Sequence, residues 1–243
     1  MSAPRGGWSP VAYARIAGVL YLITIVLGAM GEFWFRGSVY VAGNAAATAA
    51  NLKSMESLWR FGIAAEVVLL ICTIATVMVF YVLLRPVNRP IAVLMALSGL
   101  VGVSVEAAHA MHLVEALLPL GKAEYLKAFT PDQLAAMAML AIRAHSLGFG
   151  MALIFFGPFF LTAGSLIFKS GYFPKALGLL YLLPGVSYPV SSFALILAPV
   201  FASRYYFAIA GPAIIGEGAV CLWLLVKGVR ARSWEELEGP PAR

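Results

Sequence analysis

Residues 60–84 read RFGIAAEVVLLICTIATVMVFYVLL, and this stretch decides the class of fold. After Arg60 it carries one charged side chain, Glu66, in an otherwise strongly apolar run. A helix needs about 20 mostly apolar residues to cross the hydrocarbon core of a bilayer. The stretch is therefore predicted to form a transmembrane helix that contains a carboxyl group.

The rest of the chain has the same apolar character. Its 243 residues are 62% hydrophobic and 12% charged, whereas a soluble domain is about 45–50% apolar and about 25% charged. Further spans are predicted near residues 13–33, 90–118, 137–168, 175–199 and 204–228. We therefore expect an all-α bundle of about six transmembrane helices over 13–229, with an N-terminal segment at 1–12 and a polar tail at 230–243.

The basic residues predict how the bundle is oriented in the membrane. Lys and Arg are more frequent beside the span ends that share a side with both termini than beside the opposite ends. Both termini are therefore predicted to be cytoplasmic, and the segments near 34–59 and 119–136 extracytoplasmic. The net charge is +6, and the basic residues behind it lie around the spans and not in one stripe. They therefore indicate a lipid bilayer as partner and no nucleic acid.

Two short polar motifs predict where helices start outside the membrane. Asn44 precedes the alanine-rich stretch AAATAANL (45–52) and is a typical N-cap. Thr130 and Gln133 form a capping-box pattern with Pro131 at the first helical position. The fourth long helix is therefore expected to begin at Pro131, before it enters the bilayer.

The sequence EAAHAMHLVE (106–115) places ionisable groups inside the third span. At about 100° per residue, Glu106, His109 and His112 lie close enough around the helix to face one cavity. Glu115 lies on the opposite side of the helix near its outer end, where we expect it to be solvated. Ionisable residues in membrane spans are costly, and they usually face the bundle interior or a water-filled cavity.

Other spans also contain ionisable residues. Counting about 1.5 Å per residue along each helix places these groups in the outer half of the bilayer or near its middle. Arg143 is expected either to reach the membrane interface or to face the bundle and neutralise a glutamate. The pattern predicts a shared polar cavity that opens outward and is lined by Glu66, Glu106, His109, His112, His145, Tyr188 and Glu217.

The last two spans are rich in proline and glycine. Pro184, Pro189 and Pro199 are expected to interrupt the fifth helix, which is tolerated where the freed backbone groups find partners or line a cavity. The glycines on either side of Glu217 allow a helix or a ligand to approach its backbone closely.

Three functions are compatible with these residues. The first is binding of a small or lipid-like molecule in the cavity, with the glutamates and histidines able to exchange protons. The second is a haem or transition-metal centre on His109, His112 and His145. Either one histidine of the third span and His145 hold a haem iron, or two or three of these histidines hold a transition metal together with Glu66 or Glu106. The third is a membrane-embedded enzyme for an apolar isoprenoid or lipid substrate, with Glu66 and Glu217 as candidate catalytic acids.

Several short stretches resemble a known family: ARIAGVLYL (14–22), AAATAANL (45–52), LLRPVNR (83–89), FKSGYFP (168–174) and PAIIGE (212–217). Their order and spacing are similar to those of the bacterial multi-pass membrane family known as domain of unknown function 4386. The resemblance implies an integral protein of the bacterial cytoplasmic membrane. It implies no catalytic residues and no activity.

Overall fold

The computed structural model describes residues 8–238, apart from the side chain of Tyr206, and these residues form helices and no strand. Six helical segments in this part of the chain are long and apolar enough to cross a membrane. This confirms the prediction of an all-α multi-pass membrane protein, whereas the orientation of its termini stays a prediction. The spanning helices are α1 (Pro10–Ala29), α3 (Glu56–Leu84), α4 (Arg89–Glu115), α5 (Pro131–Lys169), α6 (Lys175–Leu197) and α7 (Pro199–Val226).

The first span is longer than predicted. The π-helix η1 (Met30–Arg36) continues α1 without a break, so the span ends at Arg36 and not at residue 33. The backbone N–H of Gly37 donates to the carbonyl of Glu32, five residues earlier, which is the π-helical pattern. The last turn is apolar at Phe33, Trp34 and Phe35, and an ion pair between Glu32 and Arg36 lies along it.

Spatial contacts divide the chain into two compact units. Unit 1 contains the described residues of Met1–Leu22, Thr73–Gly102 and Leu153–Arg243, and unit 2 contains Ile23–Cys72 and Val103–Ala152. Each unit is therefore assembled from segments that are far apart in the sequence. A single transmembrane domain over 13–229 stays a prediction.

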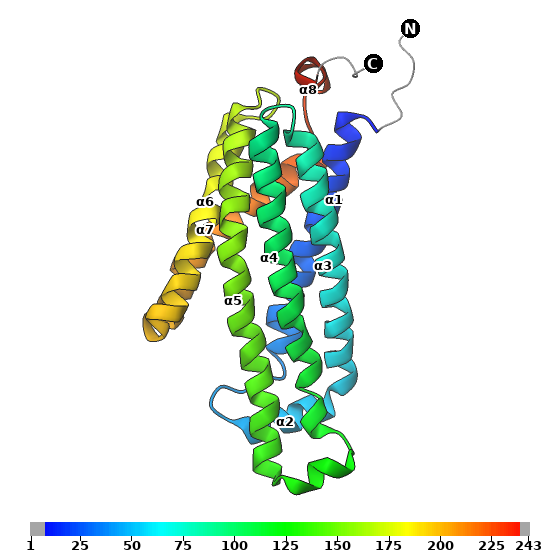
Figure 1. Ribbon diagram of the computed structural model, residues 1–243, viewed down its shortest axis with the longest axis vertical. Coiled ribbons are helices and arrows are strands. Elements are labelled where there is room, and N and C mark those ends of the chain that lie inside the picture. Colours follow the sequence, from blue (N-terminus) through cyan, green and yellow to red (C-terminus); the bar gives the residue numbers. More distant parts are fainter. Residues whose placement is uncertain (1–7, 239–243) are drawn as a thin grey trace. The chain divides into compact units, whose positions relative to one another are not determined.

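In unit 1, α6 and α7 run alongside each other (Figure 1). The prediction that Pro184 and Pro189 interrupt the fifth helix is wrong, because α6 continues through both. Each ring packs where a neighbouring helix has a glycine: Pro189 lies against Gly157, and Pro184 against Gly216. Neighbouring helices can thus accommodate the proline rings without a break in the helix.

The chain turns after α6, between two residues with non-helical backbone angles. Ala198 ends α6, with φ −145° and ψ 64°, and Pro199 begins α7 at a position that suits proline. Tyr205, with φ −111° and ψ 15°, then separates the first turns of α7 from its membrane-spanning part, Phe207–Val226.

In unit 2, a short helix and three long ones share a hydrophobic core. The short helix α2 (Ala45–Ser54) starts as predicted, since the Asn44 side chain accepts a hydrogen bond of 2.9 Å from the backbone of Ala47. It lies across the ends of α3, α4 and α5 (Figure 1). The core consists of Val39, Leu52, Trp59, Leu113, Ala116, Ala138 and Ile142.

The start of α5 also agrees with its prediction. Thr130 and Gln133 form the reciprocal capping box, with side chain to backbone hydrogen bonds of 2.8 and 3.3 Å. The helix begins at Pro131 and continues to Lys169 as one long element.

The predicted polar tail contains a helix, α8 (Ala231–Glu238), at the end of α3 (Figure 1). Its Trp234 donates a hydrogen bond of 2.9 Å to the carbonyl of Leu83, which also accepts one of 2.6 Å from Tyr172. Burial raises the pKa of Tyr172. Arg85 pairs with Glu238 at 2.5 Å. The last carbonyls of α3 lack hydrogen-bond partners within the helix, and α8 supplies a partner to one of them.

We expect Trp234→Phe to loosen α8 by about 1 kcal/mol, since it removes a buried indole donor and leaves the rest of the chain intact. Hydrogen–deuterium exchange over residues 231–238 measures this opening. Trp8→Phe is the control, because Trp8 is 63% exposed and its replacement should leave exchange in α8 unchanged. Unchanged exchange in the Trp234 variant would show that the indole does not hold α8.

Candidate functional site

The residues predicted to line one cavity belong to two separate clusters, one in each unit. Tyr188 and Glu217 lie in unit 1, and the others lie in unit 2: Glu66, Glu106, His109, His112 and His145.

Arg36 is the basic residue of the unit 2 cluster. Its guanidinium lies 3.6 Å from the carboxylate of Glu66 and 3.0 Å from that of Glu32. The side chains of Arg36 and Glu66 are 15% and 7% exposed, whereas that of Glu32 is 61% exposed. The sequence placed Arg36 in the extracytoplasmic segment 34–59. Its spacing of four residues from Glu32 was the signal that the helix extends to it.

Glu106 is the second buried carboxyl group of this cluster. The residue is 5% exposed, and no hydrogen bond or ion pair joins its side chain to another described residue. The charged groups that act on it are Glu66 and Arg36. Glu106 therefore lies within electrostatic reach of Arg36 and Glu66 and has no direct partner among the described residues.

Two histidines contact each other beside these carboxyl groups. His145 is 2% exposed, and its Nδ1 lies 3.2 Å from the carbonyl oxygen of His109, to which it can donate a hydrogen bond. The His109 ring lies against the backbone of Gly148, where an added Cβ would be 1.8 Å from its Cγ. The Nδ1 atom of His109 is buried and has no hydrogen-bond partner in the part of the chain that the structure describes.

The remaining ionisable groups of unit 2 lie closer to the surface. Nδ1 of His112 is 2.6 Å from the carboxylate of Glu115, whose side chain is 49% exposed. Arg143 is exposed and forms no ion pair with a described residue. It therefore neutralises no glutamate in this structure.

The described residues contain no group of three or more His, Cys, Asp or Glu side chains that could hold a metal ion. His145 directs Nδ1 to a backbone carbonyl, and His112 directs Nδ1 to Glu115. A metal or haem centre on His109, His112 and His145 stays a prediction, without a ligand cluster to support it.

A small pocket lies beside the Arg36 guanidinium. Its open space is about 10 Å³, which is about the volume that one water molecule requires. Trp59 is fixed in its wall, since its indole donates a hydrogen bond of 2.9 Å to the carbonyl of Leu113. The pocket is lined by Gly31, Phe35, Arg36, Trp59, Gly62, Ile63 and Leu113.

The unit 1 cluster surrounds Glu217 with phenols. Tyr21 donates a hydrogen bond of 2.8 Å to one carboxyl oxygen of Glu217, and Tyr188 donates to the other. Tyr181 in turn donates to Tyr21 at 3.2 Å, and its ring packs edge-on against Phe160. Tyr188 was predicted from the sequence as a cavity residue, whereas Tyr21 and Tyr181 were not. The seven-residue spacing of Tyr181 and Tyr188 was a signal that both lie on one face of a helix.

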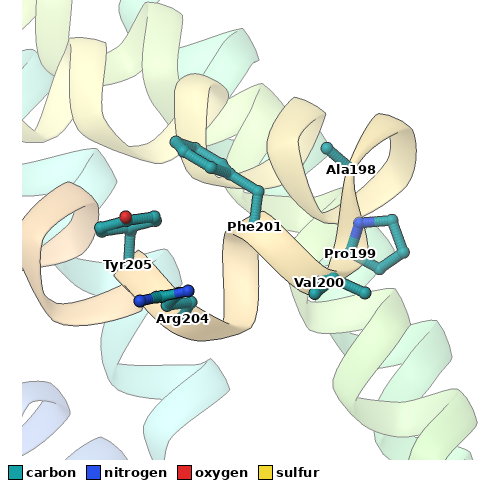
Figure 2. Close-up of a pocket in the computed structure, with 6 residues that line it drawn as sticks. All are labelled: Ala198, Pro199, Val200, Phe201, Arg204 and Tyr205. Carbon is teal, nitrogen blue, oxygen red and sulfur yellow. The ribbon is translucent and has the colours of Figure 1, made fainter.

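A wider pocket of about 530 Å³ lies at the turn between α6 and α7, and none of the predicted site residues lines it. Figure 2 shows its lining, in which the guanidinium of Arg204 lies beside the ring of Tyr205, 5.8 Å from the ring centroid. Val200 and Phe201 are 81% and 53% exposed. An arginine with exposed aromatic and apolar residues is typical of the interfacial end of a membrane helix.

The long apolar helices and their buried ionisable groups define the class: a multi-pass membrane protein. Within this class, the chain belongs to the family described as Domain of unknown function (DUF4386), whose model matches residues 16–228. The match confirms the resemblance found in the sequence. No curated protein and no solved structure matches the chain.

Proposed function

We propose that this membrane protein binds a small or lipid-like molecule with a positive charge and exchanges it for a proton at Glu106. The observation that carries the proposal is the charge imbalance around Arg36. In the described part of unit 2, two buried carboxyl groups, Glu66 and Glu106, share this one guanidinium.

The cost of buried charge explains why the imbalance matters. A single charged side chain at the centre of a membrane helix costs about 2.5–3.5 kcal/mol on insertion scales. Arg36 pairs with the buried carboxylate of Glu66 and with the exposed carboxylate of Glu32, so its charge is already offset without Glu106. The charge of the second carboxyl group, that of Glu106, is removed by a proton or offset by another cation beside it. A cationic ligand can therefore take the place of the proton.

The pocket beside Arg36 is too small for an organic cation, since it holds about one water molecule. Ligand entry then requires the Phe35 and Trp59 side chains to move apart.

The proposed setting is the cytoplasmic membrane of a bacterium, with both termini inside the cell. The distribution of Lys and Arg between the loops supports this orientation. In this orientation the cluster of unit 2 lies nearer the outer face of the membrane than the cytoplasmic face.

Calorimetry with a permanent cation tests the exchange. Phenyltrimethylammonium keeps its charge at every pH, so any proton released on binding comes from the protein. Titrations in two buffers with different ionisation enthalpies give the number of protons released. We expect release from the wild-type protein and none from Glu106→Gln, which has the same shape but no acidic proton.

Glu115→Gln is the matched control, because Glu115 lies on the same helix but is exposed and bound to His112. It should release as many protons as the wild-type protein. Equal release from the Glu106 variant, or no binding of the cation by the wild-type protein, would overturn the proposal.

A further inference from the structure

Glu217 differs from Glu66 in that no basic side chain within residues 8–238 pairs with it. Its two carboxyl oxygens accept hydrogen bonds from Tyr21 and Tyr188, and no described Lys, Arg or His forms an ion pair with it. It lies within Phe207–Val226, the part of α7 that is apolar enough to span a membrane. In this setting a proton must remove the charge of the carboxyl group, or a cation beside it must offset that charge.

One side of Glu217 is closed by a neighbouring helix. A Cβ atom at Gly216 would lie 2.3 Å from the carbonyl oxygen of Leu180, so α6 packs directly against α7 there. This close approach holds the Glu217 backbone beside α6, which also carries Tyr188.

The other side of Glu217 is open. A Cβ atom at Gly218 or at Gly211 would meet no atom within 4 Å. Ile214 and Leu222 lie on the same stripe of the helix and are 69% and 61% exposed. In a spanning helix, an exposed apolar stripe faces the lipid. The two glycines thus leave indentations in a lipid-facing surface beside Glu217, a residue that is partly exposed.

We propose that Glu217, Tyr21 and Tyr188 form a second site, which takes a lipid-soluble amine from the bilayer. The neutral amine accepts the carboxyl proton and becomes an ammonium ion, and the carboxyl becomes a carboxylate, so charge and protons balance without another reactant. The ammonium ion pairs with the carboxylate, and the apolar body lies along the stripe from Gly211 to Leu222. This site uses residues of unit 1 alone and does not depend on the function proposed for Arg36 and Glu106.

Labelling with dicyclohexylcarbodiimide in phosphatidylcholine vesicles tests this site. The reagent is apolar, and the carboxyl O–H adds across its C=N bond, with the oxygen bonding to carbon and the proton moving to nitrogen. Mass spectrometry then locates the adduct. We expect Glu217 to be labelled well before Glu66 and Glu106, which are 6% and 5% exposed. Dodecylamine should slow labelling of Glu217 severalfold, whereas the neutral dodecanol should not.

Two variants separate the site from a general effect of the bilayer. Glu217→Gln should lose the adduct. Gly218→Leu fills the open indentation without altering the carboxyl group or its phenols, and should reduce both labelling and protection by the amine. The proposal is wrong if Glu217 in the wild-type protein is not labelled, if dodecanol protects as well as dodecylamine, or if the Gly218 variant behaves as the wild-type protein does.

Discussion

Arg36→Gln should lower the free energy of unfolding by about 3–5 kcal/mol, the usual cost of removing one partner of a buried ion pair. The substitution leaves the carboxyl groups of Glu66 and Glu106 without the guanidinium that pairs with the first and acts on the second. Reversible unfolding in mixed micelles with increasing denaturing detergent measures the loss.

A double variant separates lost charge balance from lost packing. Arg36→Gln combined with Glu66→Gln removes both charges of the pair, so most of the stability should return. Arg60→Gln is the control, since Arg60 pairs with Glu56 at 2.8 Å but both side chains are at least half exposed. It should cost less than about 1 kcal/mol. If the Arg36 variant is no less stable than this control, the pair with Glu66 does not stabilise unit 2.

Gly148→Ala should destabilise the protein by about 1–3 kcal/mol, although alanine is the better helix former. The added Cβ would lie 1.8 Å from Cγ and 2.0 Å from Nδ1 of His109, so the imidazole ring must leave its place. The carbonyl of His109 also contacts His145, so displacement of the ring should disturb that contact. Thermal unfolding in detergent measures the stability, and the proton-release titration measures the effect on the cluster.

The matched control for this substitution is Gly218→Ala. A Cβ atom at Gly218 meets nothing within 4 Å, so this variant should be as stable as the wild-type protein or more stable by up to about 1 kcal/mol. Combining Gly148→Ala with His109→Ala makes room for the methyl group and should recover part of the loss. No difference between the two glycine variants would contradict the close packing of His109 on α5.

The sequence predicted most helix positions because local rules govern them. Asn44, Thr130 and Gln133 form the predicted caps, since a cap depends on residues three positions apart. The first span, predicted near 13–33, extends three residues further, because the π-helix η1 continues α1 to Arg36. The prolines of α6 were misread because their rings pack against glycines of other helices, which no local pattern shows.

The site was only partly predictable for a related reason. The sequence identified Glu66, Glu106, His145 and Glu217 as ionisable groups inside spans, since the cost of charge in lipid singles out such residues. These residues were predicted to line one cavity because counting residues along a helix gives only the depth of each side chain. The structure assigns Glu217 to unit 1 and the others to unit 2.

The sequence by itself determined that this protein is an all-helical, multi-pass membrane protein of its family, because the length and polarity of each segment limit what it can do in a bilayer. Only the tertiary structure decided which polar groups meet. Tyr21 and Glu217 are 196 residues apart, and the packing of α1, α6 and α7 brings their side chains to within 2.8 Å. Side-chain contacts over such separations depend on how whole helices pack, through the glycines and prolines at their crossings.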